Sequence, residues 1–163
     1  YAKSKNIRAD LYPDKAFCVL DWGRGIWTYD NPWFWGTGSG TVDGELFGFN
    51  LGYGFSDRSS CSENVIFYKN KIHKLDEIDF GIPDKSLGNA RYLSNWHIKS
   101  NDGRFEAEFN PILDRSSKMN FGVIISDQHQ VFGKMTGFAV TDEGEKLEFA
   151  DFICALEVVR NKY

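Results

Sequence analysis

The sequence predicts an all-β protein, an antiparallel meander that closes into a barrel or a strongly curved sheet. The 163-residue chain is rich in residues that favour strands and tight turns, with 14 Phe, 7 Tyr and 16 Gly. Short apolar runs alternate with turn signals, and Asp-Gly between such runs is a strong hairpin signal. These signals are Asp43-Gly44, Lys69-Asn70, Asp102-Gly103 and Glu143-Gly144. The nearest helix candidate, FICALEVVRNKY at residues 152–163, reads equally well as a last strand.

Length and charge narrow the class of protein. A chain of 163 residues fits one domain. A net charge of −4 argues against a nucleic-acid surface, and no block of like charges makes a local basic patch. The sequence has no run of about 18 apolar residues, so it predicts no membrane-spanning helix.

The cysteines and histidines indicate neither a disulfide framework nor a metal. Cys18, Cys61 and Cys154 are odd in number and far apart, which favours a reduced, cytoplasmic protein in which all three are small buried hydrophobes. No two histidines are spaced as metal ligands, and there is no cysteine cluster. We therefore expect no metal and no cofactor.

The position of the Asp102-Gly103 turn predicts the strand register of the hairpin around it. A two-residue loop places Trp96 opposite Phe109 and Ile98 opposite Ala107 on an apolar face. The other face is charged, as a solvent-facing side should be. It pairs Lys99 with Glu106 and His97 with Glu108, so we expect His97 to be exposed.

The hairpin around Asp43-Gly44 predicts two unlike faces. Its apolar face pairs Gly40 with Phe47, Gly38 with Phe49, Gly36 with Leu51 and Phe34 with Tyr53. Nearly every aromatic residue lies opposite a glycine, so rings can cover bare backbone and the strands can bend. The other face pairs Trp35 with Gly52 and Trp33 with Gly54, and it also carries Thr37, Ser39 and Asn50.

Tryptophans beside hydroxyls and an amide resemble the lining of a pocket. We therefore interpret the first face as core and the second as a candidate site. The alternative is a second core layer whose hydroxyls are satisfied internally.

Several polar residues are candidates for chemistry. Asp21 and Arg24 are expected at a strand end, as a structural ion pair or as part of a site together with Trp22 and Trp27. Glu63 precedes a strand, where it either caps a turn or acts as a catalytic carboxylate. Asp114-Arg115 follows the strand RFEAEFNPI and is equally ambiguous. His129, between two glutamines, suits either acid–base work or a hydrogen-bonded hairpin position, and we expect it to be at least half buried.

Most of the chain resembles a known bacterial family. The segments that carry the resemblance are FCVLDWGRGIWTYDNPWFWGTGSG, GFNLGYGFSDRSSCSENVIFY, HKLDEIDFGIP, DGRFEAEFNPILDR and SDQHQVFGKMTG. They resemble the domain of unknown function 2804 family from about Phe17 onward, with Thr28 where the family often has Pro. The resemblance implies a C-terminal portion of a longer protein. It also implies a more distant similarity to calycin-like or lipocalin-like two-barrel proteins such as carotenoid hydratase and tocopherol cyclase.

Three functions follow as hypotheses. The first is binding of a hydrophobic or amphipathic small molecule in a barrel pocket formed by Trp22, Arg24, Trp27, Trp33, Trp35, Thr37 and Asn50. The second is a cofactor-free cyclase, hydratase or isomerase in which Asp21, Glu63 or His129 moves protons. The third is an interaction domain that packs on an N-terminal portion of the same protein or on a second copy.

Overall fold

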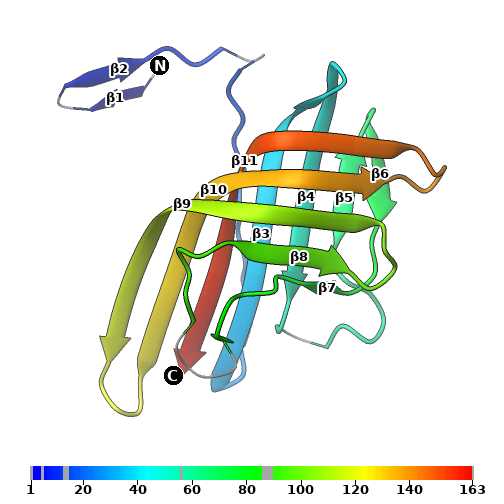
Figure 1. Cartoon of the computed structure of the whole chain (residues 1–163). Helices are drawn as coiled ribbons and strands as arrows, with labels where there is room; N and C mark the ends of the chain where they lie inside the picture. Colours follow the sequence, from blue (N-terminus) through cyan, green and yellow to red (C-terminus); the bar gives the residue numbers. More distant parts are fainter. Residues whose placement is uncertain (1, 5, 13–14, 56, 86–89, 163) are drawn as a thin grey trace.

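The computed structural model describes residues 2–4, 6–12, 15–55, 57–85 and 90–162. Nine strands form one antiparallel sheet in the order β6-β5-β4-β3-β11-β10-β9-β8-β7, and β1 and β2 form a separate hairpin (Figure 1). Their bounds are β1 (Ala2–Ser4), β2 (Ile7–Ala9), β3 (Asp30–Val42), β4 (Glu45–Tyr53), β5 (Val65–Tyr68), β6 (Lys71–Lys74), β7 (Ile78–Asp79), β8 (Trp96–Ser100), β9 (Phe105–Asn120), β10 (Ile125–Val140) and β11 (Lys146–Lys162).

The prediction of an all-β fold is confirmed, because those residues contain no α-helix. The ambiguous tail belongs to β11, the last strand. We expected a long loop at residues 81–94, but residues 86–89 of it lie outside the described part of the chain.

The sheet is strongly curved because its three longest strands bend. Figure 1 shows β9, β10 and β11 crossing in front of β4–β6 and then turning downward to run beside β3. The bends coincide with irregular register between Phe132 and Gly133 and between Met135 and Gly137. Such bulges increase local twist and let a sheet fold over itself. The two halves of the sheet thereby enclose one core.

Aromatic side chains fill the space inside the curl. Phe49, Phe80, Trp96 and Phe109 are among the largest fully buried residues, and they belong to one continuous hydrophobic cluster. Trp96 meets Phe109 edge to face with centroids 5.3 Å apart, and it stacks on Phe80 at 6.3 Å. The inside of the curl is therefore packed core rather than a ligand pocket, which corrects the expectation of a pocket within a barrel.

Both predicted hairpin registers are confirmed. β3 pairs β4 from Phe34–Tyr53 to Val42–Glu45, and β8 pairs β9 with Trp96 opposite Phe109. Asp43 and Gly44 are both left-handed, at φ +52° and +80°, as the predicted two-residue turn requires. The second loop is longer than predicted, because β8 ends at Ser100 and β9 begins at Phe105, and there Gly103 adopts φ +69°. One predicted pair is wrong: Trp33 does not pair with Gly54, because β4 ends at Tyr53 and Gly54 turns away at φ +90°.

On the core face, a glycine opposite an aromatic residue leaves room for the ring to pack against the backbone. A Cβ added to Gly38 would lie 2.8 Å from the Phe49 ring, so the ring covers bare backbone as expected. On the opposite face Trp35 pairs with Gly52 as predicted. The atoms nearest to a Cβ added at Gly52 belong to the Glu63 carboxylate, so that side chain lies over the glycine.

Two further expectations are corrected. Cys154 is buried, but Cys18 and Cys61 are exposed. Asp21 and Arg24 do not stand at a strand end, because residues 15–29 contain no strand. We call residues 15–29 the crossing segment, since its Phe17 and Val19 lie against Thr37 and Ser39 of β3.

Candidate functional site

We call the side of the sheet opposite the core its outer face, and a row of polar side chains crosses it. Trp35 on β3 donates its indole N–H to Asn50 Oδ1 at 2.8 Å. The amide of Asn50 in turn donates to Glu63 Oε2 at 2.8 Å. The row continues across the neighbouring strands, where Trp35 pairs with Glu157, Glu157 with Gln130, and Gln130 with Arg115. It therefore spans five strands from β4 to β9.

A cleft of about 250 Å³ opens along this row, and we call it the Trp33 cleft. Trp33 forms its aromatic wall, and Trp33 meets Phe55 edge to face with centroids 6.0 Å apart. Trp27 of the crossing segment packs on the same Phe55 at 5.0 Å. The remaining wall is mostly polar. Lining residues are Trp33, Arg115, Ser116, Ser117, Gln128, His129, Gln130, Glu157 and Val159.

Glu157 is the acidic group of the Trp33 cleft. Gln130 Nε2 donates to Glu157 Oε1 at 2.6 Å. Burial raises the pKa of Glu157, and the negative charge of Asp21 raises it further, against the opposing effect of the Gln130 hydrogen bond. Glu157 therefore favours its protonated form more than a solvated glutamate does, and in that form it can donate a hydrogen bond.

The predicted ligand-binding residues divide among several places. Trp33 lines the Trp33 cleft, and Trp27 supports it through Phe55. Thr37 and Asn50 line a neighbouring, more open cleft of about 370 Å³ together with Val19 and Glu63. Trp35 lies between these two clefts, where its indole N–H donates a hydrogen bond to Asn50. Trp22 and Arg24 are exposed and line none of these clefts.

The structure does not bring the three predicted catalytic residues together. Asp21 and Glu63 lie on the outer face, near Glu157 and Asn50 respectively. His129 points to the core side, where Tyr92 stacks on its ring at 3.9 Å. The acid–base roles of the three residues stay predictions, and of the three it is His129 that lines the Trp33 cleft.

His129 belongs to a separate cluster at the edge of the core. Its Nδ1 lies 2.7 Å from Asp114 Oδ2, and its Nε2 lies 3.5 Å from Asp127 Oδ1. The second oxygen of Asp114 is buried without a hydrogen-bond partner. Burial and the charges of Asp127 and Asp114 raise the pKa of Tyr92. The predictions that His97 is exposed and that His129 is mostly buried with a partner are both confirmed.

Asn64 and the pair Asp114-Arg115 also have defined places. Asn64 is fully buried and clamps two chain segments, accepting from Gly52 N–H at 2.6 Å and donating to the Asp76 carbonyl at 2.8 Å. Asp114 and Arg115 do not follow a strand but lie within β9, because that strand continues to Asn120 after its bend. Successive residues of a strand point to opposite faces, so Asp114 faces the core side and Arg115 the outer face.

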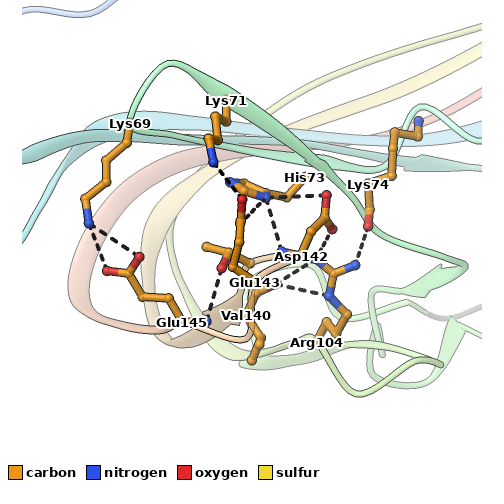
Figure 2. A network of polar contacts seen from close by, with 10 residues as sticks. Lys69, Lys71, His73, Lys74, Arg104, Val140, Asp142, Glu143 and Glu145 are labelled. Carbon is orange, nitrogen blue, oxygen red and sulfur yellow. Dashed lines mark hydrogen bonds and ion pairs between the residues drawn. The ribbon is translucent and has the colours of Figure 1, made fainter.

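A second polar network holds the two halves of the sheet together (Figure 2). The buried His73 on β6 accepts a hydrogen bond from the Asp142 N–H at 3.1 Å, in the turn between β10 and β11. Lys71 reaches Glu143 of the same turn at 2.7 Å, and Arg104 reaches Asp142 at 2.6 Å. The Lys71 ammonium holds the pKa of Glu143 below its ordinary value. These hydrogen bonds and ion pairs link β6 to the turn between β10 and β11, so we assign the network a structural role.

Sequence reasoning left Arg115 ambiguous and missed Gln130 and Glu157 as members of the outer-face site. Glu157 lies in the tail that read as either helix or strand, so its face could not be assigned. The one available signal is the change from apolar Leu156 to polar Glu157 in LEVV, which indicates opposite faces once that tail is taken as a strand. Its pairing with Trp35 joins residues far apart in the sequence, and no turn signal indicates it.

The fold and the Trp33 cleft define a class of protein: a curled, single-sheet β protein with a filled core and an aromatic-walled polar cleft on its outer face. The chain belongs to the family described as a domain of unknown function, DUF2804, whose model matches residues 2–163. No curated protein matches it, and no solved structure does. In the part of the chain that the structure describes, no helix is long and apolar enough to cross a membrane.

Proposed function

We propose that the chain binds a small amphipathic molecule in the Trp33 cleft. The observation that carries this proposal is the combination of an aromatic wall, Trp33, with the hydrogen-bonding side chains of Gln128, Gln130 and Glu157. Binding sites for small molecules typically join apolar walls to a few placed polar groups, which set the orientation of the ligand. An apolar part of the ligand would lie on the indole, and a polar part would meet the amides.

The size of the cleft limits the ligand. About 250 Å³ is somewhat below the roughly 300–1,000 Å³ of most ligand pockets. A ligand would therefore be small or would extend into solvent along the outer face. The more open cleft beside Thr37 and Asn50 lies farther along the same face and offers a continuation.

The test uses N-phenyl-1-naphthylamine, an uncharged apolar probe that fluoresces when it leaves water. Titration of the wild-type protein should give saturable fluorescence. Trp33→Ala should weaken probe binding by about tenfold or more, which corresponds to roughly 1.4 kcal/mol. Trp22→Ala is the matched control, because Trp22 is exposed and lines none of the clefts.

Two results would contradict the proposal. One is probe affinity that Trp33→Ala leaves unchanged. The other is equal loss in Trp33→Ala and Trp22→Ala, which would show that the probe binds exposed apolar surface rather than the cleft.

A second candidate function is that of an interaction domain, and the crossing segment favours it. Leu20 and Trp22 are 91% and 77% exposed, and Ile26 is fully exposed. Large apolar side chains gathered in one exposed segment mark surfaces that bind other proteins. The partner would be a second copy of the chain or another portion of the same protein.

Light scattering after size-exclusion chromatography tests the second-copy form of this candidate. We expect the wild-type chain to dimerise with rising concentration and the double variant Leu20→Ser, Ile26→Ser to remain a monomer. A wild-type chain that is monomeric at every concentration would exclude the second copy as the occupant of this surface.

A further inference from the structure

Arg115 is an exposed arginine that lines the Trp33 cleft, and no carboxylate of the described residues pairs with it. Five other arginines each meet an acidic partner: Arg8 with Asp10, Arg58 with Glu77, Arg91 with Asp84, Arg104 with Asp142, and Arg160 with Asp30. Among the described residues Arg115 forms no ion pair. Its one hydrogen bond runs from Nη1 to Gln130 Oε1 and is long, at 3.4 Å.

Gln130 separates Arg115 from the acid of the cleft. It stands between them in the row, accepting from Arg115 through Oε1 and donating to Glu157 through Nε2. Glu157 is thereby held on the far side of the amide from the guanidinium. The guanidinium consequently keeps most of its donors free for a bound anion.

Two uncharged side chains, Ser117 and Gln128, also line the cleft. Ser117 pairs with Gln128 in the next row of the outer face. A hydroxyl and an amide can each donate to an acidic oxygen without adding a competing negative charge. Arg115, Ser117 and Gln128 thus form a donor-rich end.

The aromatic end lies across the sheet from these donors. Trp33 is on β3 and Arg115 is on β9, and β11 and β10 lie between them. Three strand spacings separate their backbones by about 14 Å. The two ends are therefore far enough apart to engage different parts of one molecule.

The geometry points to an amphipathic organic anion as the ligand of the Trp33 cleft, with its acidic group on Arg115 and its apolar body on Trp33. This inference rests on the proposed function and specifies its ligand class. A guanidinium binds a planar or tetrahedral acidic group through parallel N–H donors, and such charge-assisted bonds are stronger than neutral ones.

The experiment compares two probes that share one aromatic body. 8-Anilinonaphthalene-1-sulfonate carries an acidic group, whereas N-phenyl-1-naphthylamine does not. Wild-type protein should bind the sulfonate more tightly. Arg115→Gln should weaken sulfonate binding by about tenfold and leave the neutral probe unchanged, while Arg115→Lys should retain part of the preference. Arg24→Gln is the control, since Arg24 is exposed, lines none of the clefts and forms no ion pair among the described residues.

Each outcome decides a separate point. Equal affinity for both probes, unaffected by Arg115→Gln, would overturn the anion inference and leave the proposed function standing. Sulfonate affinity that falls equally in Arg115→Gln and Arg24→Gln would also overturn it, because the preference would then follow total charge. Failure of both probes to bind, or indifference of both to Trp33→Ala, would overturn the proposed function and the anion inference with it.

Discussion

The hairpins β3–β4 and β8–β9 both carry Asp-Gly in their connecting loops, yet their outer faces have different surroundings. In β8–β9 the outer face meets water, and His97 lies 2.6 Å from Glu108 as an exposed cross-strand pair. In β3–β4 the outer face lies beneath the crossing segment, and Trp35 joins a hydrogen-bonded row that continues onto β11. Turn chemistry sets the register of each hairpin, but the neighbouring elements decide what a face is used for.

The core faces of the two hairpins, in contrast, are equivalent. Phe49 of β4 and Phe105 of β9 meet edge to face with centroids 5.6 Å apart, and both are fully buried. The hairpins are therefore two walls of one core. The difference between them is confined to the outer face, and the following predictions test that separation.

The largest effect is expected on the core face. Phe49→Ala removes a buried ring that packs over Gly38 and against Phe152, and it should lower the free energy of unfolding by about 3–5 kcal/mol. Urea denaturation followed by circular dichroism measures the loss. A loss below about 1 kcal/mol would mean that the core repacks freely around the cavity.

On the outer face of the same hairpin the loss should be smaller. Trp35→Ala removes a half-buried ring and one hydrogen bond to Asn50, and it should cost about 1–2 kcal/mol. The same denaturation experiment compares it with Phe49→Ala. Equal, large losses in both variants would show that the outer face is a second core layer.

The glycines of the two connecting loops should cost similar amounts of stability to replace, although one loop has two residues and the other has four. Gly44 and Gly103 have positive φ and open space where a Cβ would lie, so alanine there meets only conformational strain. Gly44→Ala and Gly103→Ala should each cost about 1–2 kcal/mol at most. Paired denaturation curves test this. A clear difference between the variants would show that the crossing segment affects the turn as well as the face.

The smallest effect is a change in pH dependence on β11. The pKa of Glu157 is raised, chiefly by burial, so its ionisation favours the unfolded chain. Glu157→Gln removes this ionisation. The free energy of unfolding of the variant should therefore rise relative to that of the wild-type protein as the pH increases from the ordinary glutamate pKa of 4.5 to above the raised pKa of the folded state. Denaturant melts at pH 4 and pH 7 measure the change.

Glu148 on the same strand supplies a control of opposite sign. The Lys146 ammonium lowers its pKa, so its ionised form stabilises the folded chain above the unfolded pKa and this contribution is lost as the pH falls. Glu148→Gln should be less stable than the wild type at pH 7 and approach it at low pH. The same direction of change in both variants would refute the assignment of Glu157 to a partly buried site.

Sequence reasoning succeeded where the deciding interactions are local. An Asp-Gly turn and a period of two determine which residues of adjacent strands face each other, so both registers followed from a few neighbouring residues. The core-facing role of Phe49 and the solvent exposure of His97 followed for the same reason. The pairing failed at Gly54, where the chain leaves the sheet, because the end of a strand depends on what the next segment contacts.

Only the tertiary structure decided the composition of the site. Trp35 meets Glu157 through pairing between strands that are distant in sequence, and no local turn encodes such a pairing. Irregular register at Phe132–Gly133 bends β9 and β10, and the continuation of β9 past this bend places Asp114 beside His129 and Arg115 on the outer face. Alternation along the chain determines which residues share a face, whereas the curl of the sheet determines whether that face meets core, water or another segment.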